Sequence, residues 1–150
     1  MTYYFYTDGA TSNNGQGGAP GGWAYVCSFN NQVVTSDSGH VENATNNICE
    51  LLAVVNACKY AKKYDKFPAI IYSDSAYIVN CYKQRWFDKW LRNGWINSKK
   101  EPVANKELWE ELIKYFEDWN FDFQKVKGHA GVELNEMADE LARKAKEWEF

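Results

Sequence analysis

Long apolar runs are missing from this sequence, and so are the cysteine patterns that staple small proteins. No stretch approaches the roughly 20 apolar residues that a membrane-spanning helix needs, which excludes a helical membrane protein. Residues 1–20 lack the basic and apolar segments of a secretory signal, so we expect a cytoplasmic protein. The cysteines form neither CxxC pairs nor a dense framework; they are Cys27, Cys49, Cys58 and Cys81. We expect them to be reduced and partly buried.

Basic charge is scarce over most of the chain but concentrated in one segment. The net charge is −3 and the sequence pI is about 5.4, which taken alone argues against a nucleic-acid partner. Residues 83–106 nevertheless hold seven basic and two acidic residues, a local charge of +5, so the remainder carries −8. This segregation predicts a surface that meets phosphates. The alternative is a solvated basic helix around a local cluster of tryptophans.

The periodic patterns predict one α/β domain over residues 1–150, with a five-stranded mixed sheet flanked by helices. Strands are expected at 2–8, 21–29, 32–41, 68–74 and 122–126, with the second and third joined across Asn30-Asn31. Helices are expected at 46–64, 105–119 and 135–148, with a helical or broken-helical stretch at 75–95. Asn105 and Asn135 are the expected N-caps. The strand–helix–strand order predicts that the first and fourth strands pair in parallel.

Two carboxylates end predicted core strands, Asp8 after the first and Asp74 after the fourth. Parallel strands direct their carboxyl ends toward the ligand crevice of an open α/β sheet. Two anions in a crevice repel one another unless one is protonated or a cation lies between them, and hard divalent cations prefer such oxygen ligands. Glu50 and Asp139, each on a predicted helix, add two more acids. Any one of them could be a turn, cap or solvated residue; the four together favour a metal site.

Histidine is also rare, and its two positions differ in context. His129 lies on a predicted loop between Gly128 and Gly131, just before the last helix. A histidine on such a loop, close to a carboxylate, can act as a mobile proton carrier. His40 has no comparable neighbours and is expected to be a structural or surface residue.

Several stretches, in order along essentially the whole chain, resemble type 1 ribonuclease H. They are "YTDGA", "ATNNICELLA", "IIYSDSAY" and "VKGHAGVELNEMADELA". A fifth stretch, "RWFDKWLRNGWINSKKEPVANKELWEEL", resembles the basic, tryptophan-rich protrusion of bacterial and human-like members. The resemblance implies the ribonuclease H-like fold. It also implies endonucleolytic cleavage of the RNA strand of RNA–DNA hybrids, leaving 5′-phosphate and 3′-hydroxyl ends.

The resemblance also assigns roles to residues. The implied metal ligands are Asp8, Glu50, Asp74 and Asp139, holding two Mg²⁺ ions, with Mn²⁺ a substitute. His129 matches the family's loop histidine and is expected to assist proton transfer or product release. The expected substrate contacts are Asn14, Asn46, Asn47, Lys89, Arg92, Lys99 and Asn105. The protein is expected to be a monomer. The chain departs from the family pattern at Ala76, where a glutamine is common, and in "TSNNGQGG", which carries Asn14.

Four other functions are weighed against this one. The protrusion and the "KGHAG" stretch argue against a junction resolvase, and a short self-contained chain argues against a reverse-transcriptase fragment. A hybrid-binding module without catalysis would not need all four acids. A phospho-acceptor signalling domain also places aspartates at strand ends, but it leaves the "KGHAG" stretch and the basic segment unexplained. Cleavage assays separate these functions.

Overall fold

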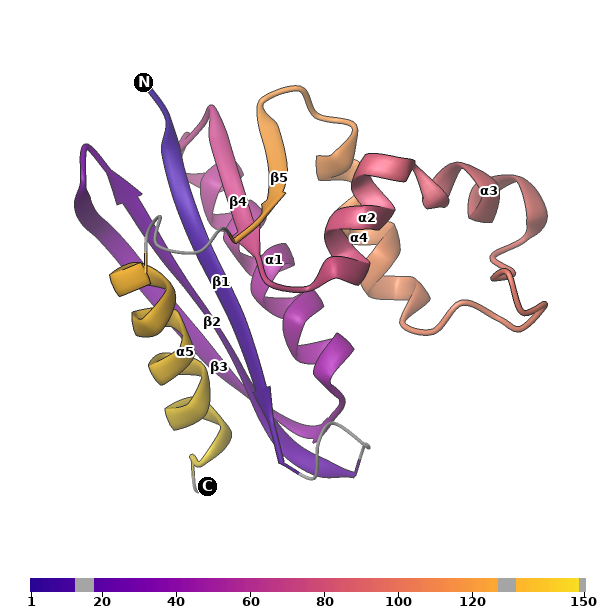
Figure 1. The fold of residues 1–150 in the computed structure, drawn as a ribbon, viewed down its shortest axis with the longest axis horizontal. Coiled ribbons are helices and arrows are strands. Elements are labelled where there is room, and N and C mark those ends of the chain that lie inside the picture. Colours follow the sequence, from indigo (N-terminus) through magenta and orange to yellow (C-terminus); the bar gives the residue numbers. More distant parts are fainter. Residues whose placement is uncertain (13–17, 127–131, 149–150) are drawn as a thin grey trace.

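Five strands form one mixed sheet in the computed structural model, which describes residues 1–12, 18–126 and 132–148 (Figure 1). The strands are β1 (Tyr3–Thr11), β2 (Ala19–Phe29), β3 (Gln32–Ala44), β4 (Ala69–Ser73) and β5 (Phe121–Lys125). Their order across the sheet is β3-β2-β1-β4-β5. β1, β2 and β3 pair antiparallel, whereas β1–β4 and β4–β5 pair in parallel. The predicted mixed sheet and the parallel pairing of the first and fourth strands are confirmed.

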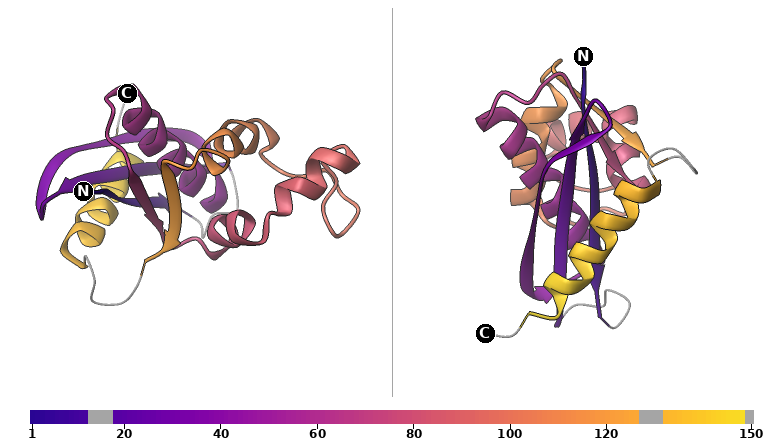
Figure 2. Two further views of the ribbon diagram at one scale, coloured as in Figure 1. Left: turned by 90° about the horizontal axis from the view of Figure 1, so that it is seen from above. Right: turned by 90° about the vertical axis from the view of Figure 1, so that its left-hand side faces the viewer.

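The helices lie in layers on the two faces of this sheet. They are α1 (Asn46–Lys63), α2 (Ala76–Gln84), α3 (Trp86–Asn93), α4 (Lys106–Phe116) and α5 (Val132–Lys146). In Figure 2 the sheet lies between α5 on one face and α1 on the other, with α2 and α4 on the side of α1. α3 projects away from the sheet, at the far right of Figure 1. None of the helices in the described part of the chain is both long and apolar enough to span a membrane.

The larger core lies between the sheet and α1. Alternate side chains of β1, β4 and β5 point to this face, and Phe5, Ile71 and Phe123 are each at most 1% exposed. They pack in one cluster with Leu51 and Val54 of α1. Each such side chain stabilises the fold by about 1.5–3 kcal/mol through burial. All four cysteines are free, as predicted, and they are fully rather than partly buried.

The second face brings α5 unusually close to β2. Three alanines of α5 itself are fully buried: Ala138, Ala142 and Ala145. A Cβ atom at Gly22 would lie only 2.2 Å from the backbone oxygen of Ala142, so the close approach requires glycine there. Small residues on both sides therefore fix the height of α5 above the sheet.

The start of α1 agrees with the sequence prediction, whereas the start of α5 differs from it. α1 begins at Asn46 as predicted, and the cap is the preceding Thr45, whose side chain accepts a hydrogen bond from the N–H of Ile48 at 3.2 Å. The stretch 75–95 is broken, as expected, at Arg85, whose φ is 53°. The prediction that Asn135 caps the last helix is wrong, because α5 already begins at Val132 and carries Glu133 in its first turn. A glutamate there complements the helix dipole and supports the earlier start.

Candidate active site

Asp8 and Asp74 occupy equivalent positions on two parallel strands. Tyr6 pairs with Tyr72 across β1 and β4, and each aspartate follows its tyrosine by two residues. The prediction that Asp8 ends its strand is wrong in detail. β1 continues to Thr11 because it still pairs with β2 there, whereas β4 stops at Ser73. Asp8 thus lies where its parallel neighbour ends, and the two carboxylates meet as expected.

Glu50 joins them because α1 passes very close to β1 at Gly9. A Cβ atom at Gly9 would lie 2.7 Å from the Cβ of Cys49 and 2.8 Å from the backbone N of Glu50, so only glycine fits. The N–H of Gly9 donates to Asp8 Oδ1 at 2.8 Å and to Glu50 Oε1 at 3.2 Å. Gly9 therefore orients two acids at once. The sequence reasoning missed this role, although the Asp-Gly pair beside a strand was visible.

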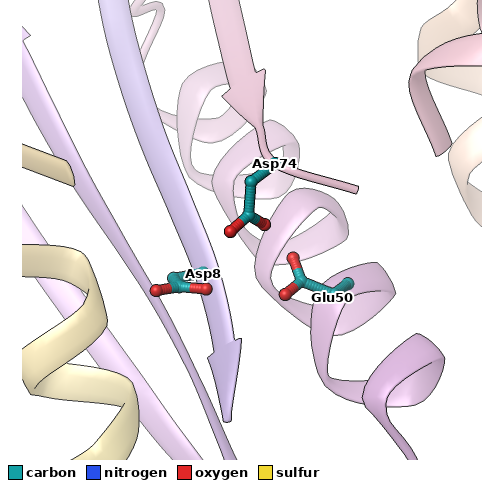
Figure 3. Close-up of side chains that lie close together, drawn as sticks. All are labelled: Asp8, Glu50 and Asp74. Carbon is teal, nitrogen blue, oxygen red and sulfur yellow. The ribbon is translucent and has the colours of Figure 1, made fainter. Parts of the chain in front are cut away.

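The three carboxylates form one compact group. Each of Asp8, Glu50 and Asp74 offers an oxygen within 4.8 Å of the others, and Figure 3 shows the three side chains directed toward a common space. Asp8 is buried, Glu50 is half-buried and Asp74 is exposed, so the group opens to solvent at Asp74. Glu50 Oε2 is buried and has no hydrogen-bond partner among the described residues. A buried carboxylate oxygen without a donor is costly, and a cation would satisfy it.

Electrostatics oppose full ionisation of this group. Burial first, and then the charge of Asp74, raises the pKa of Asp8 to about 7. Burial, followed by the charges of Asp74 and Asp8, raises the pKa of Glu50 to about 9. The charge of Asp74 thus raises the pKa of both Asp8 and Glu50, because like charges at close range repel. Hard oxygen donors in this arrangement fit a divalent cation.

Asp139 lies beside this group on α5 and is not one of the three clustered acids. α5 packs on β1, and the charge of Asp139 helps to raise the pKa of Asp8, after burial and Asp74, so the two carboxylates interact. Its Oδ2 accepts a hydrogen bond from Arg143 Nε at 3.1 Å. The structure therefore brings the fourth predicted acid to the edge of the crevice, where it is paired with an arginine.

The predicted asparagine contacts are spread around the crevice. Asn46 and Asn47 are exposed in the first turn of α1, one turn from Glu50, and Asn46 Oδ1 accepts a hydrogen bond from Thr11 Oγ1. Asn105 is half-buried before α4, as predicted, but its side chain makes no capping hydrogen bond. Its φ of 61° is left-handed rather than the extended backbone of a capping residue, which accounts for the difference.

The basic segment forms a protrusion built on tryptophans. We use "protrusion" for residues 83–106, which include α3 and the loop that follows it (Figure 1). Lys89, Arg92 and Lys99 are all exposed on it. Trp90 is buried, with ring centroids 5.7 Å from Trp95 and 5.3 Å from Trp109. A groove of about 480 Å³ lies between α2 and the protrusion, lined by Tyr77 of α2 and by Trp86, Lys89, Trp90, Asn93, Ile96, Asn97 and Ser98.

Comparison with known proteins decides the family. The model of the RNase H family matches residues 1–147. This chain belongs to the RNase H family. It is 44% identical over 138 residues to the ribonuclease H of Caldicellulosiruptor saccharolyticus, a match that covers 92% of this chain and 91% of that protein. The predicted family is thereby confirmed, and the protein is a nuclease of the hydrolase class.

Solved ribonuclease H domains share its fold. The solution structure of the PFV RNase H domain superposes with a TM-score of 0.79 at 28% identity, covering 97% of this chain and 96% of that one. The foamy viral protease-reverse transcriptase in complex with RNA/DNA hybrid gives a TM-score of 0.84 at 22% identity, covering 97% of this chain and 20% of that one. The second likeness, at its low identity, establishes the fold alone.

Two expected functional residues of this ribonuclease H, Asn14 and His129, lie outside the described residues. His40 lies within them. Its ring Nδ1 is 2.8 Å from the backbone oxygen of Ala145, so it ties β3 to the end of α5. The expectation that His40 is structural rather than catalytic agrees with this contact.

Proposed function

We propose that this ribonuclease H hydrolyses the RNA strand of RNA–DNA hybrids at the crevice formed by β1, β4 and α1. The observation that carries the proposal is the group of three carboxylates with oxygens within 4.8 Å of one another. Family membership over residues 1–147 supports the same reaction. The foamy viral enzyme of the same fold was solved with such a hybrid.

The acids fit a pair of divalent cations, with Mg²⁺ the expected ion and Mn²⁺ a substitute. Asp8, Glu50 and Asp74 would hold them, with Asp139 completing the set from α5. The unpartnered Oε2 of Glu50 supports this fit, since a buried carboxylate oxygen needs a donor or a cation. When bound, two such cations lower the pKa of an attacking water and stabilise the departing 3′ oxygen, which leaves 5′-phosphate and 3′-hydroxyl ends.

The chain itself supplies orientation and proton transfer. The N–H of Gly9 fixes the rotamers of Asp8 and Glu50, so the ligand oxygens need little rearrangement. The exposed carboxylate of Asp74 leaves an open side through which a phosphate enters. His129 is proposed to carry a proton to or from the reacting groups, because an imidazole titrates near neutral pH.

Selection of a hybrid of any sequence rests on groove shape and on 2′-hydroxyls. The wide minor groove displays 2′-hydroxyls, and amide side chains both donate to and accept from them. Asn46 and Asn47 are exposed one turn from Glu50 and suit this task, and Asn14 is proposed to act with them. On the protrusion, Lys89, Arg92 and Lys99 would contact phosphates of the DNA strand. Asn105 is proposed as a further substrate contact.

We further propose a single ribonuclease H domain over residues 1–150, acting as a monomer in the cytoplasm. Segments from near both ends of the chain pack together, since α5 lies against β1 and β2. The four buried free thiols suit a reducing compartment.

The deciding experiment compares four labelled substrates: an RNA–DNA hybrid, duplex DNA, duplex RNA and a four-way DNA junction. Each is incubated with wild-type protein in Mg²⁺ or in EDTA, and strands and end groups are analysed. We expect cleavage only of the RNA strand of the hybrid, only in Mg²⁺, with 5′-phosphate ends. Cleavage of the junction would indicate a resolvase. Binding of the hybrid without cleavage would indicate a binding module.

A further inference from the structure

Arg143 forms an ion pair with the acid at the edge of the crevice. Its Nε lies 3.1 Å from Asp139 Oδ2, one helical turn away on α5. The two side chains are about half exposed, at 57% and 48%. Asp139 in turn lies next to Asp8, whose pKa its charge helps to raise. The guanidinium of Arg143 is therefore paired with Asp139, the acid beside the cluster of Asp8, Glu50 and Asp74.

The neighbouring pair on the same helix provides a comparison. Lys144 Nζ lies 3.1 Å from Glu140 Oε1, with the same one-turn spacing and similar exposure. Asp139 and Glu140 are consecutive on α5, so their side chains point in different directions, and it is Asp139 that helps to raise the pKa of Asp8. Two ion pairs of the same kind thus lie on α5, and the acid of the first, Asp139, interacts electrostatically with Asp8.

We propose that Arg143 is a positioning residue that occupies Asp139 until a divalent cation displaces it. The inference rests on the proposed function, because it concerns the cation site of that same crevice. A carboxylate oxygen engaged by a guanidinium is less available to a cation, and the positive charge of Arg143 also disfavours a cation nearby. In the metal-free protein the pair offsets the repulsion between Asp139 and Asp8.

Removal of Arg143 is therefore expected to raise the affinity for cations and to lower the stability of the metal-free protein. Removal of Arg143 leaves Asp139 without a competitor, so divalent cations bind more tightly. The same removal leaves an uncompensated carboxylate beside Asp8, so the metal-free protein melts at a lower temperature. A substitution that merely damages the fold would weaken cation binding, so tighter binding is the diagnostic result.

The test is a titration of the metal-free protein with Mn²⁺ in the absence of substrate. Binding is measured by calorimetry and by electron paramagnetic resonance. Arg143→Gln is expected to lower the Kd for Mn²⁺ about two- to fivefold, the range for a partly exposed ion pair. Arg143→Lys keeps a cation in place and should stay close to wild type. The control Lys144→Gln removes the same charge from the neighbouring pair and should leave the Kd unchanged. Arg143→Met keeps the apolar stem and serves if Arg143→Gln folds poorly.

A double variant ties the effect to Asp139. In an Asp139→Asn background, Arg143→Gln should give no further decrease in the Kd. Three results would overturn the inference: unchanged or weaker binding in both Arg143→Gln and Arg143→Met, equal tightening in Lys144→Gln, or full tightening in the Asp139→Asn background. The proposed cation site itself is tested separately with Asp8→Asn. If wild type binds no Mn²⁺, or if Asp8→Asn binds it as well as wild type does, the proposed site fails whatever Arg143 does.

Discussion

The carboxylates of Asp8 and Glu50 share a single backbone donor, the N–H of Gly9, at 2.8 Å and 3.2 Å. One donor cannot neutralise the buried Asp8 and the half-buried Glu50, and Asp74 adds a third charge within 4.8 Å. No ion pair to these three acids is present in the described part of the chain, so a cation would offset their repulsion. This deficit underlies the predictions below.

Loss of one clustered acid should stop catalysis but not binding. Asp74→Asn keeps the shape of the side chain and removes the exposed anion of the group. We expect hybrid cleavage in Mg²⁺ to fall about 10³-fold or more, because several kcal/mol of transition-state stabilisation depend on the cations. Hybrid affinity, measured by fluorescence anisotropy, should persist. Asp37→Asn, on β3 outside the crevice, is the control; wild-type turnover in Asp74→Asn would contradict the assignment.

The metal-free protein should lose stability as pH rises. The pKa values of Asp8 and Glu50, about 7 and about 9, lie above their ordinary values of 3.8 and 4.5. Between these limits the folded state holds more protons than the unfolded state. The free energy of unfolding therefore falls with rising pH, by up to about 1.4 kcal/mol per pH unit for one proton. Urea unfolding in EDTA at pH 5, 7 and 9 measures this slope.

Glu50→Gln provides the matched variant for that pH series. It removes the acid with the more strongly raised pKa and keeps the side-chain volume. Its unfolding free energy should depend less on pH than that of wild type, above all between pH 7 and 9. An equal slope in the two proteins would show that Glu50 does not carry the effect.

The protrusion should control affinity rather than chemistry. Charge reversal of Lys89, Arg92 and Lys99 to glutamate should raise KM and flatten its salt dependence, because fewer counterions are released from the hybrid. Its kcat should change little, since α3 and the loop after it, which carry these residues, project away from β1, β4 and α1 (Figure 1). The control reverses Lys63, Lys114 and Lys144, which are exposed outside the protrusion. An unchanged KM at moderate salt would make the protrusion a structural element.

His129 is expected to assist the reaction without binding the cation. His129→Ala should slow turnover by about 10²–10⁴-fold, the usual contribution of a general acid or base. The Kd for Mn²⁺ in the absence of substrate should stay at the wild-type value. Loss of cation binding in that titration would instead make His129 a ligand.

The acids of the site could be predicted because they follow local patterns. Two apolar strand patterns in the sequence each lead into an aspartate, and this repetition predicts that Asp8 lies near Asp74. The prediction is correct because β1 and β4 pair in parallel. The end of β1 was predicted too early, because the strand is prolonged by its partner β2, and local sequence does not contain that partner. The start of α5 was missed for a similar reason, since Asn135 looked like a cap but lies inside the helix.

Other features depend on contacts between distant residues. The role of Gly9 follows from the position of Cys49, 40 positions later in the sequence, at a separation that leaves no room for a Cβ atom. The basic protrusion was visible as a charge count, but the packing of Trp90 against Trp109 requires the fold. The sequence shows Arg143 one helical turn after Asp139, and the structure shows that the two side chains form an ion pair.

The central claim is that the acids form a cation site that is strained when empty, and four thermal melts test it directly. Wild type and Asp8→Asn are each melted in EDTA and in excess Mg²⁺. In EDTA we expect Asp8→Asn to be more stable than wild type by ~0.5–2 kcal/mol, because a functional repulsion is relieved. Excess Mg²⁺ should stabilise wild type more than the variant, since the cation binds the folded site. If Asp8→Asn melts below wild type in EDTA and Mg²⁺ stabilises both equally, the acids are structural partners and the account is wrong.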